Sequence, residues 1–234
     1  MTDSGGGMEI FMKVTALIVA GGSGSRMGAG KNKVFLPLGG KTVIEKTLDV
    51  FFLSPAIDEA VIVARKEDMT ECKRLFADAP KPVTVTEGGA TRRLSVYNGL
   101  RECRGEIVVI HDAARPLVNT AMIEESIREC EKNGAAAVGV ECVDTLKTID
   151  GGYITGTVDR SHICRIQTPQ TFFLKDIKEA HRQAEAEGFE ATDDCALYEK
   201  YKGKIKLVPG STLNIKITYA DDLKFAEEVL KGKR

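Results

Sequence analysis

The chain has 234 residues, of which 43% are hydrophobic and 29% are charged. This composition is typical of one large or two small folded domains and excludes a disordered or simple repetitive chain. Thirty-three basic and 34 acidic residues give a formal net charge of −1, so no global positive field directs the protein to nucleic acid or to an anionic membrane.

Residues 1–11 lack the basic and apolar regions of a secretory signal, and we expect them to form a flexible leader. No apolar run approaches the roughly 20 residues that a membrane-spanning helix needs. Six cysteines are dispersed without a C-x-x-C pair. We therefore expect reduced thiols and a cytoplasmic location, rather than a zinc site or a disulfide scaffold.

Short runs of β-forming residues recur along the chain, and most are uniformly apolar, as in strands that are buried on both faces. Segments with helical patterns separate several of these runs, so the sequence predicts an α/β fold with a mainly parallel sheet. The predicted strands span residues 14–20, 60–64, 83–86, 106–110, 135–140 and 205–208.

Local signals also place helix ends. Residues 42–45, Thr-Val-Ile-Glu, form a capping box for a helix that runs to about residue 52. Asn133-Gly134 predicts the end of a helix that begins near Thr120. Thr218 and Asp221 are placed to cap a last helix.

One segment interrupts the alternation of strands and helices. Residues 144–150 and 153–158 flank Gly151-Gly152, and two glycines between β-rich runs predict a tight hairpin. We therefore expect a β-arm, over about residues 142–163, inserted in the α/β core.

A glycine-rich loop with three cations follows the first predicted strand. Over residues 21–33 it reads Gly-Gly-Ser-Gly-Ser-Arg-Met-Gly-Ala-Gly-Lys-Asn-Lys, and no acidic residue occurs from Ile10 to Ile44. Glycines let backbone N–H groups reach a phosphate without obstruction. The glycine spacing matches neither the dinucleotide fingerprint nor the P-loop. We predict a polyphosphate site here, in preference to a plain turn with solvated lysines.

Two further turns of this kind follow later strands. Asp112 and Arg115 stand after the strand 106–110, at the edge where open α/β sheets bind ligands. A carboxylate there can hold Mg²⁺ against phosphates, although a role in capping a turn is the alternative. Gly88-Gly89 links another strand to a helix, and His111 is expected to be structural.

Taken in order, these motifs resemble the 2-C-methyl-D-erythritol 4-phosphate cytidylyltransferases over about residues 13–230. The glycine loop alone resembles the wider nucleotidyltransferase superfamily. The resemblance implies a single Rossmann-like nucleotidyltransferase domain over residues 12–234, with a mainly parallel twisted sheet. The matching runs are 20–27, 88–89 with Ser95, 111–116, 144–145, 157–160, 167–170, 192–193 and 214–216.

The resemblance implies transfer of CMP from CTP to 2-C-methyl-D-erythritol 4-phosphate with release of pyrophosphate, in non-mevalonate isoprenoid biosynthesis. Mg²⁺ is the implied cofactor, and the implied partners are CTP, a small sugar-alcohol phosphate and a second copy of the chain joined through the β-arm. No nucleic-acid or membrane partner is expected. Because a phosphate monoester is already anionic near neutral pH, fixed cations rather than a general base should stabilise the transition state.

The resemblance also assigns roles to individual residues. The triphosphate and the transition state fall to Arg26, Lys33 and Lys216, and the metal to Asp112. Nucleotide contacts fall on Ala20, Gly21, Gly22, Gly24, Gly89, Ser95 and Ala113. Acceptor contacts fall on Arg115, Thr145, Arg160, Thr168 and Thr192, some of them donated by the partner's arm. Lys31 competes with Lys33, which we prefer because Val-Phe-Leu follows it, as in the family.

The chain departs from the family pattern at several positions. Val19 and Asn32 replace prolines, Ala90 replaces an acid, and Ile163-Cys164 replaces Leu-Trp. Two alternatives stay open. A ribitol-5-phosphate cytidylyltransferase of teichoic-acid synthesis shares the glycine loop but usually lacks the run at 157–160. A non-catalytic nucleotide-binding protein would be expected to lack some of the cations named above.

Overall fold

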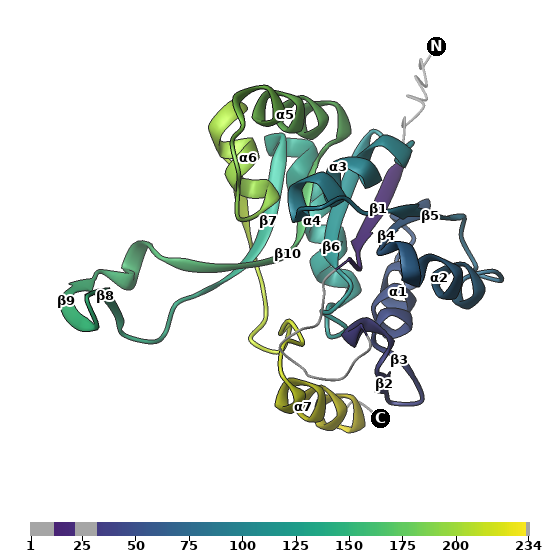
Figure 1. The fold of residues 1–234 in the computed structure, drawn as a ribbon, viewed down its shortest axis with the longest axis horizontal. Coiled ribbons are helices and arrows are strands. Elements are labelled where there is room, and N and C mark those ends of the chain that lie inside the picture. Colours follow the sequence, from purple (N-terminus) through teal and green to yellow (C-terminus); the bar gives the residue numbers. More distant parts are fainter. Residues whose placement is uncertain (1–11, 22–31, 233–234) are drawn as a thin grey trace, which may run out of the picture.

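The computed structural model describes residues 12–21 and 32–232 of the chain. The expected leader, residues 1–11, and most of the glycine loop, residues 22–31, lie outside this range. The main sheet has seven strands in the order β11-β7-β10-β6-β1-β4-β5 (Figure 1). All of these strands run in one direction except β10, which confirms the predicted α/β class. The strands are β1 (Val14–Val19), β4 (Glu59–Ala64), β5 (Val83–Glu87), β6 (Ile107–Asp112), β7 (Ala135–Glu141), β10 (Cys164–Phe173) and β11 (Lys206–Pro209).

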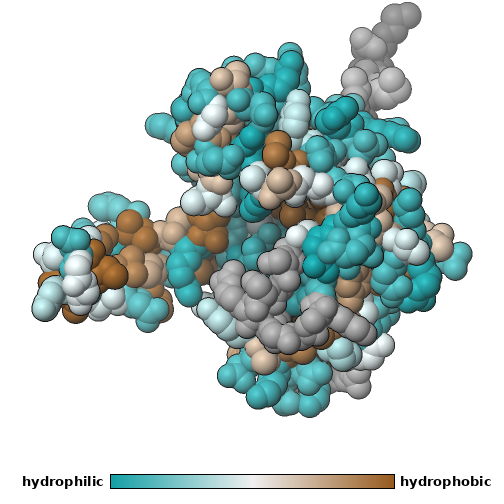
Figure 2. Space-filling model, viewed as in Figure 1, coloured by the Kyte–Doolittle hydropathy of each residue, from teal (hydrophilic) through white to brown (hydrophobic). Residues whose placement is uncertain are grey.

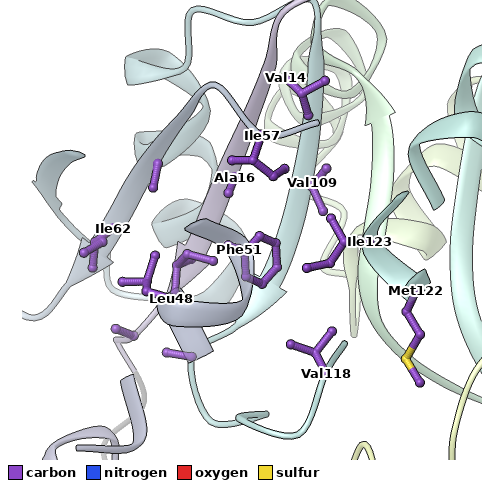
Figure 3. Close-up of a cluster of buried hydrophobic side chains, with 14 of the residues drawn as sticks. Val14, Ala16, Leu48, Phe51, Ile57, Ile62, Val109, Val118, Met122 and Ile123 are labelled. Carbon is purple, nitrogen blue, oxygen red and sulfur yellow. The ribbon is translucent and has the colours of Figure 1, made fainter. Parts of the chain in front are cut away.

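Helices cover both faces of this sheet, and the sequence of β1 shows why its strands are uniformly apolar. Ala16 and Ile18 belong to the buried cluster on one face, and Leu17 belongs to the cluster on the other face. Figure 3 shows the first cluster, in which Phe51 lies among strand and helix side chains. The helices are α1 (Val43–Leu53), α2 (Met69–Leu75), α3 (Arg92–Glu102), α4 (Thr120–Asn133), α5 (Leu174–Glu187), α6 (Asp194–Tyr201) and α7 (Ala220–Lys231).

Smaller elements complete the described chain. The short strands β2 and β3 pair with each other, and α7 packs beside them through a third buried cluster. No helix within residues 12–21 and 32–232 combines the length and the apolar character that spanning a bilayer requires. The remaining elements are β2 (Pro37–Leu38), β3 (Lys41–Thr42) and the 3-10 turns η2 (Lys33–Phe35), η3 (Lys66–Asp68) and η4 (Arg160–His162).

The strand β10 is present although the sequence analysis did not predict it. Its interior contains Pro169, which lacks a backbone N–H and is unusual in a central strand. The pairing of β10 with β7 shifts register between Ile166 and Gln170. This irregularity lets the strand pass through the proline without losing its place in the sheet.

The predicted helix ends are confirmed for α1 and α4. Thr42 and Glu45 form the expected reciprocal capping box at the start of α1. The helix α4 ends at Asn133, followed by Gly134 with a φ of +89°, a conformation that favours glycine.

The predicted cap of the last helix is wrong. The carboxylate of Asp222 accepts the backbone N–H groups of Thr218 and Tyr219 at 2.7 and 2.8 Å. Asp221 instead forms an ion pair with Lys224 on the exposed face of α7. The carboxylate at the third helical position reaches back to the preceding backbone, as in a capping box.

The predicted hairpin is confirmed. Strands β8 (Leu146–Asp150) and β9 (Tyr153–Val158) pair antiparallel across Gly151-Gly152, whose φ angles are +53° and +85°. Two positive φ angles match the turn type that joins tightly connected strands. The arm extends away from the body of the molecule, between the end of β7 and the start of β10 (Figure 1).

Candidate active site

The candidate site lies where the strand order changes direction. From β1 the chain continues to β4 and β5 on one side, and β6 then pairs with β1 on the other side. A crevice at the carboxyl ends of two such strands is the usual ligand site of an open α/β sheet. Val19 and Asp112 are register partners there, and the N–H of Ala113 donates to the carbonyl of Val19 at 3.0 Å. The predicted edge is therefore assembled.

The predicted nucleotide contacts from β1 and β5 lie close to one another. Ser95 Oγ accepts the backbone N–H of Gly89 at 3.0 Å and donates to the carbonyl of Thr91 at 2.8 Å. A Cβ at Gly21 would lie 3.9 Å from the same Oγ. A Cβ at Gly89 would lie only 2.4 Å from the Cβ of Leu94, so this position requires glycine.

Asp112 carries the ion pairs at the centre of the site. Its Oδ2 lies 2.9 Å from Lys216 Nζ and 3.4 Å from Arg115 Nε. Burial alone would raise the pKa of Asp112, but Lys216, Arg115 and Arg92 together hold this pKa well below its usual range. The carboxylate is therefore ionised over the whole neutral range.

The donor set at Asp112 fits a magnesium ion that is held mainly by phosphates. Within residues 12–21 and 32–232, both ion pairs of Asp112 use Oδ2, so Oδ1 is the candidate metal ligand. The described residues contain no group of three or more His, Cys, Asp or Glu side chains placed to hold a metal. Mg²⁺ commonly takes one or two carboxylates and fills its remaining positions with water and phosphate oxygens.

His111 has the structural role that the sequence analysis expected. Thr168 Oγ1 accepts the N–H of Asp112 at 3.1 Å and donates to His111 Nδ1 at 3.0 Å. His111 Nε2 then donates to the carbonyl of Arg115 at 3.2 Å, a pattern that fits a neutral ring. Burial lowers the pKa of His111 to about 4. His111 therefore fixes the backbone around Asp112 and stays uncharged.

Asn214 fixes the loop that carries Lys216. Its buried side chain donates to Gln167 Oε1 at 3.2 Å and to the carbonyl of Thr168 at 3.0 Å. Its own carbonyl accepts Arg115 Nη1 at 2.8 Å. Two segments distant in sequence, the loop after β11 and the middle of β10, are thereby joined at the site.

Lys33 directly follows Asn32, a buried residue whose side chain holds the local backbone in place. Asn32 Nδ2 donates to the carbonyl of Ala20 and to Asp68 Oδ2, each at 2.9 Å, and Asn32 Oδ1 accepts the N–H of Val34. The side chain of Asn32 thus ties the turn η2 to the end of β1. The predicted Arg26, Gly22, Gly24 and the competing Lys31 lie outside the described residues.

The predicted acceptor residues divide into two groups. Arg115 and Thr168 lie beside Asp112, and exposed Thr192 precedes Asp193, which accepts Gln170 Nε2 at 2.8 Å. Thr145, just before β8, and Arg160, at the start of η4 after β9, are exposed. The arm that contains β8 and β9 extends away from the body of the molecule (Figure 1). Arg160 Nη1 donates to the carbonyl of Val143 at the base of the arm.

One cluster of charged side chains beside the site is not predicted by any local sequence pattern. Arg92 Nη2 lies 2.9 Å from Asp194 Oδ2, and Asp194 Oδ1 lies 3.1 Å from His181 Nε2. Arg92 follows Gly88-Gly89 closely, which was the available signal. Its partners are on helices about 90 and 100 residues away, so no local pattern joins them.

A doubly wound sheet with an ionised carboxylate and two cations at its switch point fits the class of Rossmann-like nucleotidyltransferases. A family model for 2-C-methyl-D-erythritol 4-phosphate cytidylyltransferase matches residues 14–232. The chain belongs to this family.

Curated relatives and solved structures agree with this assignment. The cytidylyltransferase of this name from Geobacillus thermodenitrificans is 40% identical over 225 residues, which cover 95% of this chain and 99% of the relative. That of Clostridium acetobutylicum is 42% identical over 221 residues, covering 92% and 96%. The crystal structure of 4-diphosphocytidyl-2C-methyl-D-erythritol synthase from Anaerococcus prevotii has a TM-score of 0.84 at 33% identity, covering 94% of this chain and 99% of that one.

Proposed function

We propose that the protein transfers CMP from CTP to 2-C-methyl-D-erythritol 4-phosphate and releases pyrophosphate, a step of isoprenoid precursor biosynthesis. The observation that carries this proposal is the family match over residues 14–232. The ionised Asp112 with Lys216 and Arg115 at the switch point supplies the matching chemistry. The family match favours methylerythritol phosphate over ribitol phosphate as the acceptor.

The reaction needs positioning and charge more than proton transfer. An oxygen of the acceptor's phosphate forms a bond to the α-phosphorus of CTP, and the bond from that phosphorus to the bridging oxygen of pyrophosphate breaks. Negative charge grows on the α-phosphoryl oxygens and on the leaving group. Lys216, Lys33 and Arg26 are the cations that we assign to this charge.

Nucleotide recognition is assigned to the group around Gly89. Ala20, Gly21, Gly89, Ser95 and Ala113 lie at one edge of the sheet, where hydrogen bonds within the protein hold Gly89 to Ser95 and Ala113 to Val19. Such fixed groups can distinguish the edge of cytosine from those of other bases. Gly22 and Gly24 are assigned to the phosphates because glycines expose backbone N–H groups.

Mg²⁺ is the proposed cofactor, with Asp112 as its protein ligand. When bound, the ion neutralises charge on the phosphates. A cytoplasmic location fits six cysteines that are all free of disulfides.

The acceptor site is proposed to be shared between two chains. Arg115, Thr168 and Thr192 come from one chain, and Thr145 and Arg160 come from the arm of the partner. The arm exposes Ile149, Tyr153 and Ile154, which are 74%, 78% and 69% exposed, and Figure 2 shows apolar side chains along it. A two-stranded hairpin is marginally stable alone, and a second copy can cover these side chains about a two-fold axis.

The direct test is pyrophosphate release from CTP and Mg²⁺ with either sugar phosphate. We expect release with 2-C-methyl-D-erythritol 4-phosphate, and much less with ATP, GTP or UTP in place of CTP. Faster release with ribitol 5-phosphate would overturn the acceptor. No release with any pair would favour the non-catalytic alternative.

A further inference from the structure

Arg92 is held by a buried carboxylate that no assigned role explains. Arg92 is the first residue of α3, three positions after Gly89, and its Nη2 pairs with Asp194 Oδ2 at 2.9 Å. Asp194 is the first residue of α6 and is fully buried. Burying an ionised carboxylate is costly in solvation, and the partly exposed Arg92 supplies the opposite charge.

Two further side chains fix the position of the Asp194 carboxylate. Asp194 Oδ1 lies 3.1 Å from Nε2 of His181 on α5, whose side chain is also fully buried. The ring of Tyr97 stacks on that of His181, with centroids 5.8 Å apart and planes 14° apart. Side chains of three helices, α3, α5 and α6, therefore fix the position of one carboxylate under Arg92.

The guanidinium of Arg92 has N–H donors that its ion pair with Asp194 does not use. Arginine carries five N–H donors in a planar fork, and within residues 12–21 and 32–232 Asp194 is the acceptor that the structure gives it. The side chain is 31% exposed. Arg92 begins α3 just after the carboxyl end of β5, and Asp112 ends β6, which runs in the same direction. Arg92 therefore starts its helix at the same edge of the sheet as Asp112.

The neighbours of Asp194 indicate which phosphate Arg92 serves. Asp194 directly follows Thr192 and Asp193, and Asp193 accepts Gln170 Nε2, two residues beyond Thr168. Thr192 and Thr168 are the residues assigned to the acceptor. Arg92 therefore follows the proposed nucleotide-binding residue Gly89 in sequence and forms its ion pair with Asp194, which belongs to the segment assigned to the acceptor.

We propose that Arg92 binds the phosphate monoester of the acceptor, and that Asp194, fixed by His181, is the positioning residue that aims its guanidinium. This proposal rests on the proposed function. A guanidinium fork binds phosphate through two parallel N–H···O bonds, and a partner carboxylate that fixes the fork lowers the cost of ordering it.

The test is a kinetic comparison of Arg92 variants with a matched control. In Arg92→Gln, we expect the KM for 2-C-methyl-D-erythritol 4-phosphate to rise about 10- to 100-fold, the usual effect of removing a charged hydrogen bond. The KM for CTP should stay within about threefold. Arg92→Lys should raise this KM by less than Arg92→Gln does, because lysine keeps the positive charge but lacks the planar set of N–H donors. The control, Arg93→Gln, removes the next arginine, whose partners are Glu185 and Glu190, and should leave both KM values unchanged.

Asp194 is tested through its dependence on Arg92. Asp194→Asn should raise the same KM, and Arg92→Gln/Asp194→Asn should be no worse than Arg92→Gln alone, because the pair acts as a unit. The double variant also removes both charges together, so it leaves no unpaired buried charge if Asp194→Asn alone folds poorly. Circular dichroism checks the fold of each variant.

The outcomes separate this inference from the proposed function. If the wild-type protein releases no pyrophosphate from CTP with this acceptor, the proposed function fails. If the wild type is active and Arg92→Gln keeps its acceptor KM within threefold, the inference is overturned and the function stands. An equal or larger rise in the KM for CTP would also overturn it, because Arg92 would then serve the nucleotide.

Discussion

The side-chain amide of Asn32 donates a hydrogen bond to the backbone carbonyl of Ala20, with 2.9 Å between nitrogen and oxygen. Ala20 is the residue after β1, and Lys33 is the residue after Asn32. One buried side chain therefore connects the proposed nucleotide contact to the proposed catalytic lysine. The resemblance leads us to expect a proline at position 32, and a proline has no side-chain donor for this bond.

Asn32→Ala should lower both stability and kcat. It leaves the carbonyl of Ala20 without its buried donor, which costs about 1–3 kcal/mol in the free energy of unfolding. Urea unfolding and steady-state kinetics measure the two effects. The control is Asn133→Ala, since the Asn133 amide bonds to its own helix at the exposed end of α4 and its loss should change stability by less than about 0.5 kcal/mol. Equal effects at the two positions would contradict a special role for Asn32.

Lys33→Ala should lower kcat by about 10²–10³, the usual effect of removing one preorganised charge donor. Its effect on CTP binding should be smaller, because the lysine is assigned mainly to the transition state. Lys31→Ala serves as the comparison and should be mild. The reverse ranking in pyrophosphate-release assays would show that Lys31 holds this role.

Asp112→Asn should keep the fold and increase the demand for metal. The amide has nearly the same shape, and Lys216, at 43% exposure, can be solvated when its partner is lost. We expect the Mg²⁺ concentration for half-maximal activity to rise by at least about tenfold. A variant with the parent's Mg²⁺ dependence would reduce Asp112 to a residue that organises Lys216 and Arg115.

Stability should fall in mild acid because of His111. Its pKa is about 4 in the folded chain and about 6.5 when unfolded, so the unfolded chain binds the proton first. The stabilisation is full above about pH 6.5 and is lost as the pH falls toward 4. The loss between pH 7.5 and pH 5 should be about 2 kcal/mol. Urea titrations of wild type and His111→Gln measure it, and a variant that keeps the full pH dependence would assign the effect elsewhere.

Much of this fold is predictable because its signals are local. Ala16 and Leu17 are buried on opposite faces of the sheet, so the strand that contains them is apolar throughout and is recognised from a few residues. The strand β10 is not recognised, because Pro169 and its polar neighbours are typical of a loop. Its place is fixed by pairing with β6 and β7, which no local pattern encodes.

The candidate site likewise contains some residues that local sequence patterns predict and others that they do not. Asp112 and Gly89 were predicted because parallel strands bring their carboxyl ends to one edge. The cluster of Arg92, Asp194 and His181 was missed because its members come from three helices and meet only when these pack together.

Mixing two inactive variants tests the shared acceptor site. Arg160→Ala and Lys33→Ala homodimers should both be inactive. If each site takes Arg160 from the partner, a heterodimer has one site with both lesions and one with neither, so activity should return toward half per dimer. Verified heterodimers without recovered activity would mean that each site is built from one chain. Mixing two preparations of the same variant is the control.

The base of the arm is closed by the sheet itself. Glu141 of β7 lies opposite Cys164 of β10, and the N–H of Cys142 donates to the carbonyl of Ile163 at 3.3 Å. Topologically, residues 143–162 are therefore the loop of a β-hairpin whose two strands lie side by side in the main sheet. Such a loop can be exchanged as a module, so grafting the arm of a relative would test the proposed pairing of two chains without altering the residues of the crevice.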